Sequence, residues 1–514
     1  MTTLAARPGR RVDVPLLLFL ILLLDVRLPV KFPVLVIACV LQPGFWKAFF
    51  RRDPKVPVFY PLILGVALLD WILYQGLGNV RYDVVGATAL IFWLACWVAS
   101  TQVRLFTERL DPALLHRTLL VFFLCNAVVS LVNLVSIDWE IKALNPYLYQ
   151  GMYQKYFIRT GDYVKGLTFD TSITNALINA FGVVYFLARK QGWTMLLCMA
   201  CMLATGSNFT NYLLLGVFAY LFIFKSDREQ KGGIALCILI GVVFLGKVSP
   251  QNQKYTAEVV NRWLPAQNKV TKTTDPDSAQ KMQVWQQWNN IRFSYVNPWK
   301  PKPVIPATDI NTPPYQSRAD TTEDQRTLIT FKEQNRAALP LADLSGLPED
   351  GHRPGKLLAF EEIGQFFKTH PNRIMTGDGP GNFSSKLAFR ATGLELYGKY
   401  PASLIYIHPD FLHNHLQLFL SYFAKSKENH SLIHSPDSVY GQLLGEYGLV
   451  GIGIFLVGYV AFFIARIKGT AYSLPLLGIL LGAFFVGYWF EQLSIVVLFE
   501  LMVFVDRKTM LWKA

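Results

Sequence analysis

Two titratable side chains, His434 and Glu446, flank the start of an apolar run in the stretch HSPDSVYGQLLGEYGLVG. Histidine titrates near neutral pH, so at the mouth of a cavity it suits a general base that takes a proton from a hydroxyl. A lone surface histidine without a role is the alternative. A carboxylate within an apolar run usually lines a polar cavity or pairs with a partner. Glu446 therefore either belongs to such a cavity or bonds a neighbouring helix and fixes the bundle.

The residues around this stretch predict helices. Asp437 can cap a helix that begins near Ser438. Glu446 then lies on roughly the same face as Gln442, and Gly441, Gly445 and Gly448 allow a neighbouring helix to approach closely. Apolar residues also recur at helical spacing in GKLLAFEEIGQFFKTH.

A second candidate is the stretch HPNRIMTGDGPGNF, in which Gly377, Gly379 and Gly381 alternate. Successive small residues let backbone N–H groups form a nest for an anion, although a tight turn between helices produces the same pattern. The stretch lacks the Lys-Ser/Thr ending of a P-loop, so it does not imply ATP. The histidines of this region match no paired-ligand spacing, and we predict neither a metal site nor a cofactor. They are His408, His413, His415, His430 and His434.

A third candidate is the basic and aromatic stretch YLYQGMYQKYFIRTGDYVKG, which contains Arg159 and Lys165. Guanidinium and ammonium groups beside a membrane can hold a lipid-linked phosphate or pyrophosphate. The interleaved tyrosines could stack on sugar faces. An aromatic belt that anchors a loop at the membrane surface is an equally good interpretation.

The composition indicates the elements that must position these residues. Of 514 residues, 52% are hydrophobic and only 16% are charged. Uncharged runs such as DVVGATALIFWLACWVAS are long enough, at about 1.5 Å per residue, to cross most of a hydrocarbon core of roughly 30 Å. The formal charge of +14 comes from short basic clusters between apolar runs, which is typical of membrane topology rather than of nucleic-acid binding. We predict an all-α polytopic membrane protein.

Apolar runs predict about 12 transmembrane helices. They start near Val14, Val30, Val56, Asp83, Ala113, Thr168, Trp193, Phe209, Gly233, Ser438, Tyr472 and Gln492. Residues 1–248 form a membrane bundle of about nine spans with an outer segment at 137–166. Residues 249–437 form one large, partly helical extracytoplasmic loop before the tenth span, and 438–514 add about three spans. With both termini cytoplasmic, the basic clusters fall on the cytoplasmic side.

Three stretches, in this order, resemble the O-antigen ligase-related superfamily of membrane glycosyltransferases. KGLTFDTSITNALINA resembles its basic lead into a new span, and FFKTHPNRIMTGDGPGNF resembles its His-Pro and Gly-x-Gly-x-Gly-x-Phe element. HSPDSVYGQLLGEYGLVG resembles its His-Asn/Ser element followed by Glu-x-Gly. The chain departs from the family at Asn208 and Lys165, where arginine is usual.

The resemblance implies a metal-independent, inverting transferase in the bacterial cytoplasmic membrane, with an undecaprenyl-pyrophosphate-linked oligosaccharide as donor. His434 would deprotonate the acceptor hydroxyl, and Glu446 would orient His434 or a basic partner. The acceptor would be another glycan, lipid A core or a protein hydroxyl. Residues assigned to substrate binding are Arg159, Lys165, Arg373, Gly377, Gly379, Gly381, Arg390 and Tyr440.

Two questions stay open from the sequence. A transporter or flippase of lipid-linked glycans is the alternative function, although such a protein would carry charges near mid-membrane and pseudo-symmetric halves. Polymerase and ligase use the same donor and differ in the acceptor, so the motifs do not separate them.

Overall fold

The computed structural model describes residues 12–24, 28–42, 44–50, 56–74, 78–141, 145–148, 164–168, 171–250, 355–393, 401–416, 418–419, 422, 432, 435–467 and 469–513. Within these ranges the regular elements are helices, and none is a strand. The prediction of an all-α protein is therefore confirmed for this part of the chain.

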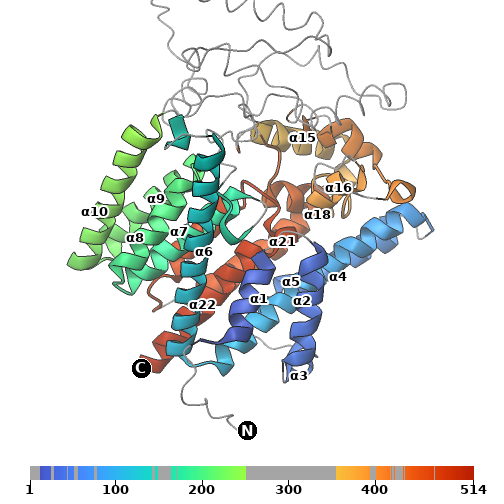
Figure 1. Ribbon diagram of the computed structural model, residues 1–514. Helices are drawn as coiled ribbons and strands as arrows, with labels where there is room; N and C mark the ends of the chain where they lie inside the picture. The colour runs from blue at the N-terminus through green and yellow to red at the C-terminus, as the bar shows by residue number, and fades with distance from the viewer. Residues whose placement is uncertain are drawn as a thin grey trace, which may run out of the picture.

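The N-terminal half is a series of apolar helices (Figure 1). They are α1 (Val14–Leu24), α2 (Leu28–Leu41), α3 (Phe45–Phe50), α4 (Phe59–Tyr74), α5 (Val80–Arg109), α6 (Pro112–Ile141), α7 (Ser172–Ala188), α8 (Gly192–Ala204), α9 (Asn208–Phe224) and α10 (Arg228–Val243). Short helical turns accompany them at η1 (Pro146–Leu148), η4 (Gly166–Thr168) and η5 (Phe244–Val248).

The C-terminal part contains a polar group of short elements and then a second set of apolar helices. The first group is α15 (Gly355–Thr369), η7 (Pro371–Arg373), α16 (Lys386–Ala391), η8 (Ala402–Leu404) and η9 (Phe411–Leu416). The second is α18 (Val439–Phe455), η11 (Leu456–Val460), α19 (Ala461–Ile467), α20 (Ser473–Ala483), α21 (Trp489–Gln492) and α22 (Ser494–Lys513). A helix thus begins close to each of the predicted starts.

Among the residues that the structure describes, four helices are long and apolar enough to cross a membrane. They are Val80–Arg109, Pro112–Glu140, Arg228–Val248 and Val439–Ile467. The other apolar helices of the described chain have 10–17 residues, fewer than the roughly 20 that a straight span needs. The chain is a helical membrane protein, whereas the number of crossings stays a prediction.

Helix α22 forms the centre of the bundle, and most of its residues from 494 to 506 are buried against α5, α7 and α20. Two of its carboxylates are buried with partners. The Tyr60 hydroxyl donates to Glu500 over 2.5 Å, and the amides of Tyr472 and Ser473 donate to Asp506 over 2.9 and 3.0 Å. These contacts fix α4 and α20 to α22. The outer face of α6 exposes Val128, Leu131, Val132, Val135 and Trp139, as expected of a surface that faces lipid.

Basic residues at the ends of α5, α7 and α22 lie at one end of the bundle. Lys508 donates to the Leu110 carbonyl over 2.5 Å, and Arg189 donates to Thr509 over 3.4 Å. Arg109 pairs with Asp13 at 3.4 Å, which joins the end of α5 to the start of α1. Helices α15 and α16 lie at the opposite end of the bundle (Figure 1). The protein therefore has one basic end and one end built from its polar C-terminal elements.

Candidate functional site

Helix α18 begins at the predicted place and then breaks. The Ser438 side chain caps it by accepting the Gly441 amide, whereas Asp437 had been the expected cap. At Gly448 the backbone leaves the helical region, with φ 61° and ψ −156°. Apolar helix continues beyond the break to Ile467. The sequence predicted close packing at this glycine but not a break.

A turn formed by residues 374–379 enters the helix at this break. In a continuous helix the amides of Leu449 and Val450 would donate to the carbonyls of Gly445 and Glu446. Here Leu449 and Val450 donate instead to Ile374 and Met375, over 2.9 and 3.0 Å. The carbonyls of Gly445 and Glu446 accept from Asp378 and Gly379, over 2.9 and 3.0 Å. Four bonds to the turn thus replace two bonds of the helix, which keeps the buried backbone satisfied.

Glycines make this approach possible. Both Gly377 and Gly448 have a positive φ, which L side chains rarely adopt. A Cβ at Gly377 would lie 2.4 Å from the carbonyl carbon of Glu446. A Cβ at Gly445 would lie 2.6 Å from the ring of Phe383. The glycines of α18 were expected to allow close packing of a neighbouring helix. In the structure, Gly445 and Gly448 are instead in contact with the polar segment 375–383.

The Gly377–Gly381 segment lies beside a carboxyl group of the protein itself. The Ser385 hydroxyl and the amides of Gly381 and Phe383 act on the carboxyl group of Glu446. The amides of Gly377, Asp378 and Gly379 donate to backbone carbonyls. A pyrophosphate would have to displace these internal partners, so the substrate role of Gly377, Gly379 and Gly381 stays a prediction.

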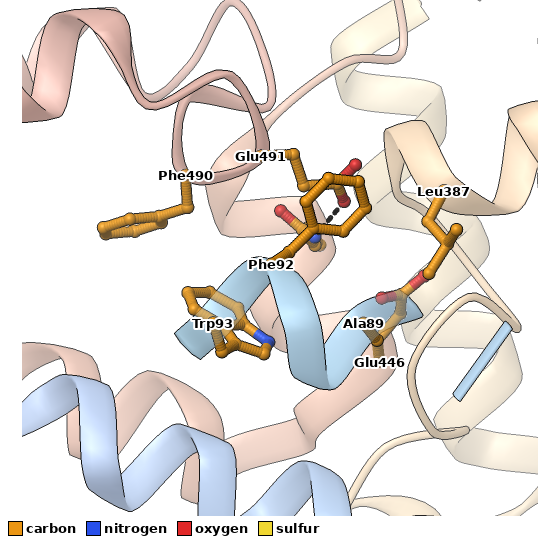
Figure 2. A pocket seen from close by; sticks show the side chains of 8 residues that line it. Ala89, Phe92, Trp93, Leu387, Glu446, Phe490 and Glu491 are labelled. Carbon is orange, nitrogen blue, oxygen red and sulfur yellow. Dashed lines mark hydrogen bonds between the residues drawn. The ribbon is translucent and has the colours of Figure 1, made fainter. Parts of the chain in front are cut away.

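Glu446 lines a small cavity with Gln442 and Glu491 (Figure 2). Ala89, Phe92 and Trp93 of α5, Leu387 of α16 and Phe490 of α21 complete the lining. The Gln442 side-chain amide donates to Glu491 over 2.6 Å. The cavity has room for about one water molecule, which is far too little for a sugar. It is a polar centre that joins four elements rather than a substrate chamber.

Cationic side chains act on the acids around this centre. Lys386 and Arg390 act on Glu491, and Arg373 acts on both Asp378 and Asp70. Arg373 lies at the end of η7, just before the inserted turn, and Arg390 lies in the last turn of α16. Arg373 and Arg390, two of the three arginines that the sequence assigned to substrate binding, therefore already interact with acids of the protein. Their substrate role stays a prediction.

A second polar group joins α15, η9 and the segment before α16. The Ser384 hydroxyl lies 2.9 Å from His415 Nε2, and His415 Nδ1 lies 3.2 Å from Glu362. Tyr488 lies 3.1 Å from the same hydroxyl. Burial raises the pKa of the Glu362 carboxyl, while His415 opposes that shift. The order of groups is that of a nucleophile, a base and an acid, but Ser384 and His415 have no exposed surface, so the group holds the fold together.

Lys356 connects α15 to the entry of α18. Its ammonium group donates to the carbonyl of Asp437, immediately before the Ser438 cap. Burial lowers the pKa of Lys356 to about 7, and the charge of Asp437 opposes this shift. The polar lead-in of α18 is thereby attached to the helix that precedes the inserted turn.

The first motif of the resemblance is held by buried asparagines. The amide of Gly166 donates to Asn133 over 2.9 Å, and that of Leu167 donates to Asn126 over 3.0 Å. Asn175 donates to the Val164 carbonyl over 2.9 Å. These bonds tie η4 to α6 and α7. The partly exposed Lys165 therefore stands on a rigid backbone, and the described contacts of η4 are with α1, α6 and α7.

The remaining site predictions have mixed outcomes. His434, Arg159 and His430 lie outside the described residues, so the roles proposed for His434 and Arg159 stay predictions. The hydroxyl of Tyr440 donates to the Leu481 carbonyl over 2.8 Å, and its ring packs on Phe485 at 4.6 Å. Tyr440 therefore links α18 to α20, and its substrate role stays a prediction.

Comparison with known proteins does not place the chain in a family. No family model matches the chain, and a search of curated proteins finds no match. The resemblance to O-antigen ligases therefore rests on the three sequence stretches alone.

Sequence reasoning missed three acids of this region. Asp378 stands between Gly377 and Gly379, and Asp410 follows His408 by two residues. Glu491 interrupts an apolar run, as Glu446 does. An acid between glycines or inside an apolar run was the available signal for Asp378 and Glu491, whereas the meeting of Asp378 with His408 depends on the fold.

Proposed function

We propose that the protein is a membrane glycosyltransferase that transfers or polymerises glycan from undecaprenyl pyrophosphate at the outer face of the bacterial cytoplasmic membrane. The observation that carries the proposal is the insertion of residues 374–379 into α18. Two of the three stretches that resemble the O-antigen ligase superfamily thereby form one hydrogen-bonded unit at the polar end of the bundle.

In this reaction the acceptor hydroxyl oxygen forms a bond to the anomeric carbon of the donor sugar. The bond from that carbon to the pyrophosphate oxygen breaks, and the pyrophosphate leaves with the electron pair. His434 takes the hydroxyl proton, as a general base within hydrogen-bond reach does. Lys165, Arg159, Arg373 and Arg390 are the candidates to stabilise the charge on the leaving group. The buried Glu446 positions the segment that contains Gly377, Gly379 and Gly381.

Several features support this arrangement. Ser438 and Lys356 fix the start of α18 and the Asp437 carbonyl before it, at the end of the bundle that also holds α15 and α16, and His434 precedes Asp437 by three residues in the chain. The basic clusters at the opposite end agree with a cytoplasmic location for that end. The polar elements would then face outward, where the lipid-linked donor is used.

The test is transfer in proteoliposomes that contain the purified full-length protein and a lipid-linked repeat unit. The unaltered protein is expected to release polyprenyl pyrophosphate and to lengthen or relocate the glycan. His434→Ala is expected to lower the rate by at least about 100-fold, because the base contributes about that much. His430→Ala, four residues before His434 in the chain and without an assigned role, is the matched control. Full transfer by a well-folded His434→Ala protein would contradict the assignment of His434 as the general base.

One observation favours the alternative, a transporter of lipid-linked glycans. Helices interrupted within the membrane often form the binding sites of transporters, and α18 is interrupted at Gly448. A flippase would move the donor between leaflets without cleaving it. The transporter is the better proposal if the protein moves the intact donor across the bilayer and releases no polyprenyl pyrophosphate, whichever acceptor is supplied.

The products also separate the two transferase classes. A polymerase joins repeat units, so its absence leaves single-repeat products. A ligase moves finished chains to lipid A core or to a protein hydroxyl, so its absence leaves long chains on the carrier lipid. Sizing of the glycan in a deletion strain therefore identifies the acceptor class.

A further inference from the structure

Beside the inserted turn, one imidazole nitrogen and two carboxylates from separate segments meet. His408 Nδ1 lies 3.0 Å from an oxygen of Asp378 and 3.6 Å from an oxygen of Asp410. One possible ligand atom from each residue lies within 4.8 Å of those of the other two. Asp378 belongs to the turn in α18, whereas His408 and Asp410 belong to the segment between η8 and η9.

The backbone holds this group in place from two sides. The Asp378 amide is fixed to the Gly445 carbonyl, and the side-chain amide of Asn382 donates to the Asp378 carbonyl over 2.7 Å. On the other side, the ring of Tyr406 packs on Tyr82 of α5, with ring centres 5.1 Å apart. The Asp378 side chain is only 2% exposed, while His408 and Asp410 are 15% and 26% exposed. The group is therefore rigid, and it is open to solvent on the side of His408 and Asp410.

These distances suit a common metal ligand set. A first-row cation binds histidine nitrogen and carboxylate oxygen at about 2.0–2.2 Å, which places neighbouring ligand atoms about 3–3.5 Å apart. The spacings of 3.0 and 3.6 Å around His408 Nδ1 are close to this range. Imidazole together with carboxylates suits zinc and manganese better than calcium, which prefers six to eight oxygens.

The local charge also favours a cation. Asp70, Asp378 and Asp410 act in this region, and Asp378 and Asp410 repel one another electrostatically. The guanidinium of Arg373 acts on both Asp70 and Asp378. A divalent cation at His408 would lie between Asp378 and Asp410 and would reduce their repulsion. An imidazole that binds a metal through Nδ1 must be unprotonated there, and its lone pair must face the metal, so the cation would displace the Asp410 amide that now lies 3.3 Å from that nitrogen as a donor.

We propose that Asp378, His408 and Asp410 form a binding site for one divalent transition cation of the zinc or manganese class. The three residues supply one nitrogen and two oxygen donors and leave further coordination positions open on the exposed side. The cation would connect the turn inserted into α18 to the segment 401–410. This site is independent of the proposed glycan transfer, because its binding can be measured without a donor or an acceptor.

The test is direct titration of the purified full-length protein in nanodiscs, after removal of metals with a chelator. The paramagnetic signal of free Mn²⁺ reports binding, and Zn²⁺ is added in competition. The expected result is one saturable site per chain that Zn²⁺ displaces. Each of His408→Ala and Asp410→Asn is expected to weaken Mn²⁺ binding by at least about 10-fold, as the loss of a ligand does.

Controls separate ligand loss from unfolding. His408 and Asp410 lie outside the turn inserted into α18, so their variants should leave the four backbone hydrogen bonds between that turn and the helix intact. Size-exclusion profiles and melting temperatures check that the variants are folded. His370→Ala removes a histidine that bonds only its neighbour Thr369 among the described contacts of its ring nitrogens, and it is expected to bind Mn²⁺ normally. Absence of saturable Mn²⁺ and Zn²⁺ binding, or unchanged binding in both folded variants, overturns the proposal and leaves a plain ion pair between His408 and Asp378.

Discussion

The backbones of Gly448 and Gly377 are in direct contact: a Cβ at Gly448 would lie 2.6 Å from the amide nitrogen of Gly377. The two residues are 71 positions apart in the chain, and they belong to the second and third stretches of the family resemblance. Their contact is the centre of the four hydrogen bonds that join residues 374–379 to α18. Most of the testable consequences of the structure start from this junction.

Gly448→Ala should destabilise the protein severely. The new methyl group would lie 2.5 Å from the Met375 carbonyl oxygen, and the backbone would keep an unfavourable φ of +61°. We expect a loss of more than about 2 kcal/mol, seen as low yield and a lower melting temperature in detergent. Gly453→Ala, five residues further along α18, meets no atom within 4 Å and should be neutral. Equal melting temperatures for the two variants would contradict the inserted-turn geometry.

Glu446→Gln should also weaken the fold, although the side chain keeps its size. Two amides and a hydroxyl act on the carboxyl group, and the NH₂ group of a glutamine cannot accept hydrogen bonds from such donors. We expect a loss of roughly 1–3 kcal/mol, measured by thermal unfolding. Glu229→Gln, at a salt bridge whose side chains are about half exposed, should cost less than about 1 kcal/mol. A Glu446→Gln protein as stable as the unaltered protein would show that the carboxylate is not a structural acceptor.

Stability should rise with pH because of Lys356. The pKa of this lysine is about 7 in the folded protein, well below the ordinary value of 10.5. The folded state therefore binds the proton less tightly than the unfolded chain, and stability increases as pH rises above about 7. The slope should reach up to about 1.4 kcal/mol per pH unit, and thermal unfolding between pH 6 and 9 measures it. Lys356→Met should remove this slope, and Lys368→Met at the exposed end of α15 should retain it.

Asn126→Ala should release the first motif from α6. The substitution removes the acceptor for the Leu167 amide and a donor to Asn175, all of them buried. We expect a loss of about 1–3 kcal/mol and faster hydrogen exchange at Leu167. Ser136→Ala, an exposed serine ten residues further along the same helix, should change neither measurement. Unchanged exchange at Leu167 in the Asn126 variant would mean that η4 is held by other contacts.

The helices were predictable because apolar runs report burial in lipid or protein directly. The starts of α6, α8 and α18 lie within one residue of the predicted positions, and α15 covers the expected GKLLAFEEIGQFFKTH segment. The lengths were less predictable. Polar residues such as Glu500 and Asp506 are buried inside α22 with partners from other helices, so composition alone does not show which helices cross a membrane.

The site was predictable in part. Glu446 and Gln442 were expected on one face of a helix, and both line the same cavity. The partner of Glu446 was expected on a neighbouring helix, whereas Ser385 and the backbone amides come from the segment before α16. The break at Gly448 and the meeting of Asp378 with His408 were not predicted, because each depends on a segment far away in the chain. Local patterns carry no information about such contacts.

The inserted turn has a consequence for biogenesis. Residues 374–379 precede α18 in the chain, and their four bonds replace two bonds that a continuous α18 would make itself. A continuous α18 satisfies its own backbone in the bilayer, whereas the break at Gly448 is satisfied only when the turn occupies it. The broken form of α18 can therefore arise only after the turn has reached the helix, so this part of the bundle is completed from its polar side.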